Sequence, residues 1–221
     1  RDFKDIEDFK NALKTQILHH YNLVRTGYNI MQSIHMLRYP VIFAGMVTKG
    51  CVESGRSVQE GGAKYSTAGL YITGAANLAD SIVAIEKCVF EDHDFTMDEL
   101  IRALDKNFEG EERMRQLLLN KPAKFGNDDP HADGVYREMM HFIADNVQTW
   151  HDARGGYYSF NIHSQTTNVS HGAVCGATPD GRLAKEPLCD NASPMMGRDV
   201  KGPTATVKSV ASQGQAGFHD G

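Results

Sequence analysis

The sequence predicts a helix-rich α/β chain that is part of a larger sheet structure. Runs with apolar residues at three- and four-residue steps predict helices over most of its length. Two segments, 65–73 and 157–167, instead carry the glycine-bounded, β-branched and aromatic pattern of strands. Two strands cannot close a sheet. We therefore expect the missing strands to come from outside these 221 residues.

Local signals place the helices along the chain. Ile6, Phe9 and Leu13 begin a long apolar stripe, and Thr96 with Glu99 forms a capping-box pattern. Proline at a first helical position is expected at Pro130 and at Pro203. The expected helices cover residues 5–36, 41–54, 75–90, 96–107, 110–119, 130–150 and a last segment from 203, with Val207 and Val210 on its inner face.

Composition excludes several classes of protein. The net charge is −5 and there is no basic stripe, so we expect no nucleic-acid partner. No apolar run is long enough to span a membrane, and the charged start is not a signal peptide. The four cysteines form no CxxC pair, which favours free thiols in a cytoplasmic protein. Because the first residue is arginine, we expect a fragment or a processed product.

The segment Gly172–Val210 is predicted to be a long ordered loop. It holds four of the seven prolines, interleaved with glycines and charged residues rather than repeated as in a flexible linker. Long loops within a compact domain are usually functional. We therefore expect this loop to contribute to a functional site.

Three groups of polar residues are candidates for chemistry. Cys51 and Glu53 could form a nucleophile with a carboxylate, although helical residues two apart point to different faces. His163 and His171 could be acid–base groups, but no carboxylate-rich ligand set has a diagnostic spacing, so no metal site is expected. On a strand, Asn161, His163 and Gln165 share one face, which either binds a substrate or forms a structural network.

A series of motifs resembles one known family. The motifs are EGGAKY at 60–65, ADSIVAIEKCVF at 79–90, NFEG at 107–110, KFGNDD at 124–129, ATPDGRLAKEPL at 177–188 and GRDVKGPTATVKSV at 197–210. In this order, they resemble the glycyl radical enzymes of the pyruvate formate-lyase superfamily. The pattern is most similar to the branch of dehydratases and C–X lyases, and it covers nearly all of residues 5–211.

The resemblance implies a barrel of ten strands surrounded by helices. Residues 1–221 would be a part of that barrel domain, downstream of the catalytic cysteine and upstream of the glycyl radical domain. In the family, an activating enzyme with S-adenosylmethionine and an iron–sulfur cluster installs the glycyl radical, which generates a cysteine thiyl radical that attacks the substrate. Both radical residues would lie outside this chain: Cys51 aligns with a later Cys-x-Glu motif, and Gly217–Gly221 does not match the radical-glycine motif.

The implied function is radical cleavage of a C–O, C–N or other C–X bond in a small oxygenated substrate. The chain alone would be inactive, would bind no cofactor and would carry no catalytic residue. The resemblance implies four substrate-binding residues, Tyr71, Thr73, His163 and Gln165, and as partners the activating enzyme and further copies in a homo-oligomer. A formate C-acetyltransferase, a decarboxylase and a fumarate-adding enzyme remain alternatives within the superfamily. A non-catalytic scaffold and a thiol hydrolase using Cys51 are alternatives of other classes.

Overall fold

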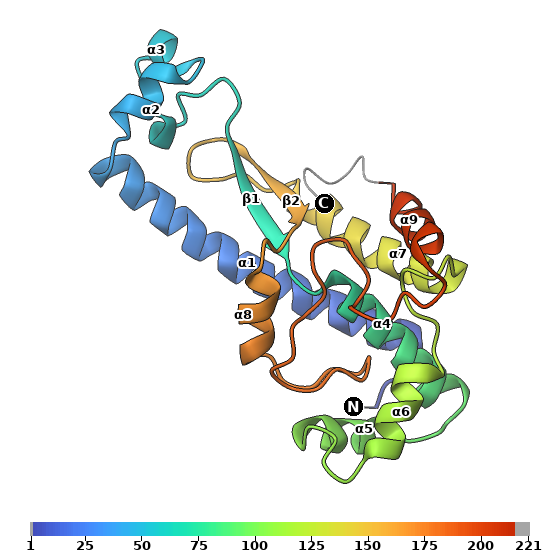
Figure 1. Ribbon diagram of the computed structural model, residues 1–221. Helices are drawn as coiled ribbons and strands as arrows, with labels where there is room; N and C mark the ends of the chain where they lie inside the picture. The colour runs from blue at the N-terminus through green and yellow to red at the C-terminus, as the bar shows by residue number, and fades with distance from the viewer. Residues whose placement is uncertain (1, 215–221) are drawn as a thin grey trace. The chain divides into compact units, whose positions relative to one another are not determined.

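The computed structural model describes residues 2–214 and is helix-rich, as predicted. A two-stranded sheet joins β1 to β2. The helices and strands are α1 (Ile6–Arg38), α2 (Ile42–Val47), α3 (Cys51–Ser54), β1 (Thr67–Ile72), α4 (Ala75–Ile85), α5 (Met97–Asp105), α6 (Glu112–Asn120), α7 (Pro130–Val147), β2 (Tyr157–Ile162), α8 (Thr167–Val174) and α9 (Pro203–Ala211) (Figure 1). A 3₁₀ turn at Val58–Glu60 and a π-helical turn at Glu86–Glu91 complete the regular structure of this part of the chain.

The chain divides into two compact units. The first contains residues up to 12, residues 71–142 and the chain from 161 onward. The second contains residues 13–70 and 143–160. The helices α1 and α7 and both strands contribute residues to each unit.

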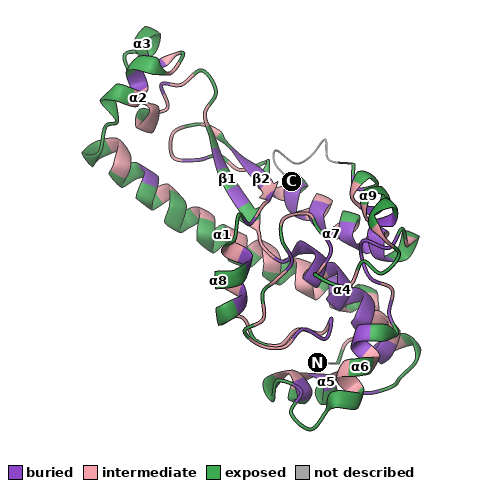
Figure 2. Ribbon diagram, in the orientation of Figure 1, coloured by how far each residue is buried: buried purple, intermediate pink, exposed green. Residues whose placement is uncertain are grey.

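Helix α4 is the centre of the first unit. Ten of its eleven residues are buried, so it shows no solvated face and is coloured as buried along nearly all of its length in Figure 2. A helix that is buried all round must be covered from several sides. Its C-terminal half packs into an apolar cluster of buried residues, which are Ala84, Ile85, Cys88, Val89, Phe95, Leu100, Ala103, Phe108 and Leu118.

Two helix starts confirm the sequence signals. Thr96 caps α5: its hydroxyl accepts a hydrogen bond from the amide of Glu99, whose carboxylate accepts one in return from the amide of Thr96. At α7, the carboxylate of Asp129 accepts hydrogen bonds from the amides of His131 and Ala132. Such caps satisfy amide groups that have no partner in the first turn of a helix.

A long loop, residues 175–202, is fixed to the start of α4. Asn77 donates a hydrogen bond to the carboxylate of Asp180 (2.6 Å) and accepts one from the amide of Cys189 (2.8 Å). The sulfur of Cys189 in turn accepts a hydrogen bond from the amide of Ala76. The prediction of an ordered loop is therefore confirmed for this segment.

In the second unit, polar contacts hold α1 against the segment before β2. Asn29 accepts a hydrogen bond from the phenol of Tyr158 (2.6 Å), and Gln32 bonds with Asp152 and with the amide of Ala153. The guanidinium of Arg25 lies 4.9 Å from the ring centroid of Trp150. The apolar stripe of α1 is thus supplemented by polar contacts on this face.

Gly61 and Gly62 are required by the backbone. Gly61 has a φ of 77°, in the left-handed region that favours glycine. A Cβ at Gly62 would overlap the carbonyl of Arg56, and one at Gly61 would meet the carbonyl of Arg154. These glycines are needed for backbone conformation and for the close approach of neighbouring backbone.

Three boundary predictions are wrong. The helix expected at 41–54 is broken into α2 and α3: Thr48 after α2 is extended, and Gly50 before α3 is left-handed, with a φ of 100°. The strand expected at 157–167 ends at Ile162, and α8 occupies the start of the expected loop. On α9, Val207 is 67% exposed, whereas Ala205 and Ser209 are buried. The buried face of this helix is therefore not the face of Val207 that the sequence predicted.

Residues 2–214 contain neither of two features considered from the sequence, a membrane span and a metal site. Neither a helix of sufficient length and apolarity to cross a membrane nor a metal-binding group of three or more His, Cys, Asp or Glu side chains occurs in this range. Gly217–Gly221, where we expected no radical-glycine motif, lies outside the described residues.

Candidate substrate-binding site

The candidate site lies in the first unit, where the C-terminal ends of β1 and β2 are followed by polar residues. Tyr71 lies near the end of β1 and Thr73 follows it. His163 follows β2 directly, and Gln165 lies in the turn between β2 and α8. All four residues that the sequence predicts for substrate binding therefore lie at the same ends of paired strands.

Two of the predicted residues contact each other. The rings of Tyr71 and His163 have centroids 6.4 Å apart and planes at 83°, which is an edge-to-face contact. Tyr71 is 48% exposed, in keeping with the alternation of exposed and buried residues along β1. The pair thus presents an aromatic surface with a phenol and an imidazole as polar groups.

Thr73 is held by a residue from another element. Its hydroxyl shares a hydrogen bond with Nδ1 of His171 on α8, at 3.1 Å. This hydrogen bond orients the Thr73 side chain and places the imidazole of His171 next to the end of β1. The sequence singled out His171 as a polar candidate but gave no reason to pair it with Thr73, since 98 residues separate the two.

The turn that carries Gln165 has an uncommon backbone. Gln165 and Thr166 are consecutive non-glycine residues with φ values of 38° and 73°. Such conformations cost energy and persist where surrounding contacts determine them. Because β2 has already ended, Gln165 does not continue the strand face of Asn161 and His163, and the predicted alternation is wrong at this position.

Ser164 is the residue that holds this turn. It is buried, and its hydroxyl donates a hydrogen bond to the carboxylate of Asp190 while accepting one from the amide of Asn191 (3.1 Å). Its own amide donates to the side chain of Asn191 (2.7 Å). Sequence reasoning missed these three residues as a group. An Asp-Asn pair in a loop is a signal for such side-chain-to-backbone bonding, but it does not reveal the partner.

We predict that Ser164→Ala lowers the free energy of unfolding by about 1 kcal/mol, because the exposed carboxylate of Asp190 and the half-buried amide of Asn191 lose a hydrogen-bond partner. Urea unfolding followed by circular dichroism measures this change. The matched control is Ser170→Ala: Ser170 is exposed and its hydroxyl donates a hydrogen bond to the carbonyl of Thr167, three residues earlier on the same helix. A loss at Ser164 no larger than that of the control would show that the turn does not depend on this hydroxyl.

Asn161 has a buried side-chain oxygen without a hydrogen-bond partner among the described residues. Buried polar atoms are almost always paired in folded proteins. The carbonyl of this amide is thus available to a donor that the described part of the chain does not provide. Of the two interpretations of the polar strand face, this atom favours a binding role over a complete structural network.

Cys51 and Glu53 do not form a reactive pair in the structure. Cys51 is 4% exposed, whereas Glu53 is exposed and its carboxylate accepts a hydrogen bond from the amide of Gly50 at 2.9 Å. The carboxylate thus caps the start of α3. The buried thiol of Cys51 and the exposed carboxylate of Glu53 therefore lie on different faces, as expected for residues two apart on a helix.

The chain matches a known enzyme family. A family model described as "PFL-like: Pyruvate formate lyase-like" matches residues 1–172. The chain therefore belongs to the pyruvate formate lyase-like family, the glycyl radical enzymes, and the family that its motifs resemble is confirmed.

Individual relatives include enzymes with named activities. The chain is 34% identical over 211 residues to trans-4-hydroxy-L-proline dehydratase of Clostridioides difficile, covering 96% of this chain and 27% of that protein. It is 35% identical over 217 residues to isethionate sulfite-lyase of Bilophila wadsworthia, covering 95% of this chain and 25% of that protein. The chain thus spans about a quarter of the length of these curated relatives.

Solved structures agree with the sequence comparison. The hydroxyproline dehydratase of C. difficile with bound substrate matches with a TM-score of 0.94 and 33% identity, over 98% of this chain and 28% of that one. The glycerol-bound B12-independent glycerol dehydratase of Clostridium butyricum matches with a TM-score of 0.92 and 34% identity, over 97% and 27%. The helix-rich α/β fold class is thereby confirmed.

Proposed function

We propose that the chain is a segment of a glycyl radical dehydratase or lyase and forms part of its substrate-binding wall. The enzyme cleaves a C–O, C–N or other C–X bond of a small oxygenated molecule. The observation that carries this proposal is the pairing of Tyr71 with His163 and of Thr73 with His171 at the strand ends. Relatives that are named for dehydration and for sulfite elimination support the reaction class.

The fold part of the proposal is that β1 and β2 are two strands of a ten-stranded barrel. A two-stranded sheet is too small to be stable by itself. The agreement with solved glycyl radical enzymes over nearly the whole chain supports this assignment. In such a barrel, loops 163–166 and 175–202 would cover the end where the strands finish, and a closed site would keep water from reactive intermediates.

The residues of this chain have binding and orienting roles in the proposal. Hydroxyl, phenol, imidazole and amide groups at the strand ends can exchange hydrogen bonds with the hydroxyl groups of a substrate. The four proposed contacts are Tyr71, Thr73, His163 and Gln165. The glycyl radical supplies hydrogen-atom abstraction, and we assign it to a glycine outside this chain, formed by an activating enzyme that uses S-adenosylmethionine and an iron–sulfur cluster. The complete enzyme would be a cytoplasmic homo-oligomer.

Kinetics of the complete enzyme test the function. After anaerobic activation, and with glycerol, 1,2-propanediol, hydroxyproline and isethionate as substrates, we expect at least one to be converted. Thr73→Val should lower kcat/KM for that substrate about tenfold or more, since one hydrogen bond to the substrate or to His171 is lost. The radical signal in electron paramagnetic resonance should stay unchanged, and Ser170→Ala serves as the control. A full radical signal with no turnover of any of these substrates would count against the reaction class.

Thiol labelling separates this proposal from a thiol hydrolase. Cys51, Cys88 and Cys189 are buried, and Cys175 is partly exposed. Burial raises the pKa of both Cys88 and Cys189 to about 11, which further slows their reaction. We predict that iodoacetamide rapidly modifies Cys175 alone in the folded protein and all four cysteines in urea, as read by mass spectrometry. Rapid labelling of Cys51 in the folded protein would favour the hydrolase.

A further inference from the structure

The second half of α1 exposes apolar side chains along one face. Leu23, Ile30 and Ile34 are between 49% and 59% exposed, and Leu37 is 81% exposed. Together with Gly27 they follow one another at alternating steps of four and three residues. This alternation, about 3.5 residues on average, is the repeat along which two helices pack side by side. We call residues 23, 27, 30, 34 and 37 the α1 stripe; Figure 2 shows most of this half of α1 as exposed.

The opposite face of the same half of α1 is polar, and it is this face that contacts the described chain. Arg25, Asn29 and Gln32 interact with the segment 150–158, and Gln32 is buried. Because successive residues of an α-helix turn by about 100°, these three residues lie opposite the α1 stripe. A helix normally turns its apolar face to the core and its polar face to water. In this half of α1 the order is reversed, which indicates that another element covers the stripe.

The surface in front of the α1 stripe is open, and α2 extends the exposed apolar area. A Cβ at Gly27 would meet no atom within 4 Å, so a partner can approach the backbone of α1 closely at this point. On α2, Ile42, Phe43, Met46 and Val47 are each at least 68% exposed. Exposed apolar residues in such number mark an interaction site rather than ordinary surface.

The charges near the stripe have one sign. Residues 9–52 contain no Asp or Glu, although the whole chain has 28 of them, and they include five Lys or Arg residues. Arg38 and Lys49 are exposed, and neither side chain forms an ion pair within residues 2–214. The stretch that carries the stripe therefore presents bases to a partner but no carboxylate.

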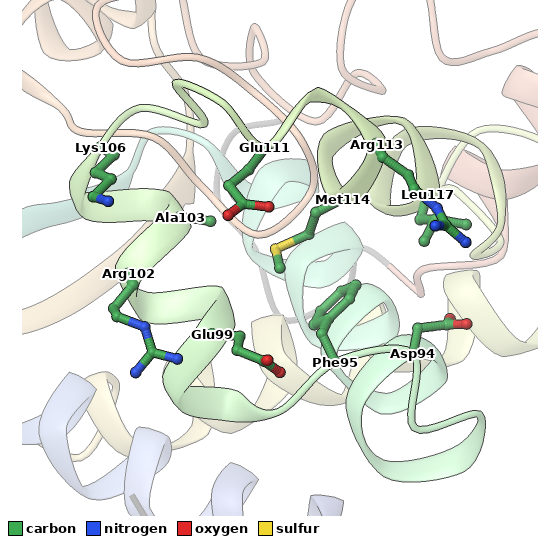
Figure 3. Close-up of a pocket in the computed structure, with 10 residues that line it drawn as sticks. All are labelled: Asp94, Phe95, Glu99, Arg102, Ala103, Lys106, Glu111, Arg113, Met114 and Leu117. Carbon is green, nitrogen blue, oxygen red and sulfur yellow. The ribbon is translucent and has the colours of Figure 1, made fainter.

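The groove between α5 and α6, in the first unit, has no such bias. Its volume is about 450 Å³, and Figure 3 shows charged side chains of both signs around Phe95 and Met114. The lining contains three acidic and three basic residues, which are Asp94, Glu99, Glu111, Arg102, Lys106 and Arg113. This balance favours no particular charge on a partner, so the α1 stripe is the better defined of the two surfaces.

We infer that the α1 stripe is the docking face for one α-helix of the same polypeptide, from the part of the complete enzyme outside residues 1–221. This inference rests on the proposed function. The chain covers 27% of its hydroxyproline dehydratase relative and 25% of its sulfite-lyase relative, so a complete enzyme of that length has most of its residues elsewhere. The stripe is about 20 Å long, which a partner helix of about 15 residues covers.

A second copy of this chain fits the stripe less well. In a two-fold interface the same surface meets itself. Arg38 and Lys49 of one copy would then face a stretch that offers bases and no carboxylate. A different helix can supply both an apolar face and flanking carboxylates.

Photo-crosslinking in the complete, unactivated protein tests the inference. The photoreactive amino acid p-benzoylphenylalanine is placed at Ile34 on the stripe and, as the matched control, at Asn22, an exposed residue of α1 off the stripe. At Ile34 we expect a cross-link within one polypeptide, and mass spectrometry should locate it in a segment outside residues 1–221 whose apolar residues repeat at steps of three and four. The yield at Asn22 should be several-fold lower. Gly27→Trp should lower the yield at Ile34 several-fold by keeping the helix away, whereas Asn22→Trp should leave it unchanged.

Four results would overturn the inference. They are a cross-link that doubles the mass on a denaturing gel, a cross-link only to residues 1–221, a yield at Ile34 no higher than at Asn22, and no effect of Gly27→Trp. Circular dichroism melting checks that each protein is folded, and the probe at Leu37 replaces the one at Ile34 if that protein does not fold. Because the cross-link needs no radical, a cross-link between two polypeptides in an active enzyme contradicts this inference alone. The expected cross-link in a protein with a full radical signal and no turnover contradicts the proposed reaction alone.

Discussion

Arg182→Met is expected to lower the free energy of unfolding by about 3–5 kcal/mol, because four partly buried acceptors lose one charged donor. Arg182 is 2% exposed. Its guanidinium donates hydrogen bonds to the carbonyls of Leu183 (3.0 Å), Glu186 (2.7 Å) and Gly176, and to the hydroxyl of Thr178 (3.2 Å). Methionine fills a similar volume but offers no hydrogen-bond donor to any of the four acceptors. Loss of this magnitude is a large part of the stability of a typical domain.

Arg182 lies in the long loop of residues 175–202, and this position explains the expected loss of stability. Residues 175–202 contain no helix or strand, and the guanidinium of Arg182 supplies hydrogen bonds to the carbonyls of Gly176, Leu183 and Glu186 within this loop. The same loop supplies Asp190 and Asn191 to Ser164 at the candidate site. Loosening at Arg182 should therefore also expose loop 175–202 to proteolysis by chymotrypsin.

Urea unfolding of two further variants provides the control. Arg182→Lys keeps the charge but not the planar fork of donors, and it should restore less than half of the loss. Arg137→Met removes an exposed arginine on α7 and should change the stability by no more than about 0.5 kcal/mol. An Arg182→Met protein as stable as the Arg137→Met control would show that the loop does not depend on the buried guanidinium.

Asp80→Asn is expected to remove a pH dependence of stability that amounts to about 4 kcal/mol. Asp80 is fully buried in α4. One carboxyl oxygen accepts a hydrogen bond from the amide of Phe125 (2.8 Å), and the other has no partner among the described residues. Burial raises the pKa of Asp80 to about 7, and Asp180 adds to this, while Lys124 and Arg198 oppose it.

The folded protein binds the proton of Asp80 more tightly than the unfolded chain does, so protonation of Asp80 stabilises the fold. Between about pH 4 and pH 7, the folded protein holds the Asp80 proton and the unfolded chain releases it. The contribution of Asp80 to stability is therefore full below about pH 4, is lost as the pH rises to about 7, and is constant above that. Asparagine does not titrate and still accepts the hydrogen bond from Phe125, so the variant should gain on the wild type as the pH rises.

Urea unfolding at about pH 4.5 and about pH 8 measures the difference, since these values bracket most of the transition. We expect Asp80→Asn to be close to the wild type at the lower pH and more stable by up to about 4 kcal/mol at the higher pH. Asp105→Asn, at an exposed position on α5, controls for the loss of one negative charge. An equal difference at both pH values would contradict the assignment of this titration to Asp80.

The sequence predicted those elements whose signals are local. The capping box of Thr96, the Asp129-Pro130 start of α7 and the strand β1 all depend on residues within a few positions of each other. The site residues at the strand ends came from the family resemblance, and the polar run after β2 agreed with them. The pairing of Tyr71 with His163 then follows from the pairing of the two strands.

Other features depend on contacts distant in sequence, and local patterns do not show them. The polar residues 164–167 suit a strand end or a helix start equally well, and the turn is decided by Asp190 and Asn191. The role of Asp80 also depends on a distant partner, the amide of Phe125, 45 residues along the chain. Gly50 lies between two helices and has a left-handed φ, whereas Gly45 lies within α2, and composition alone does not distinguish the two.

The structure of the complete enzyme with a bound substrate tests the central claim most directly. The account predicts that side-chain atoms of Tyr71, Thr73, His163 and Gln165 lie within about 4 Å of the substrate, at the end of a closed barrel that includes β1 and β2. A substrate bound elsewhere, with these four side chains in contact only with protein or solvent, would contradict it.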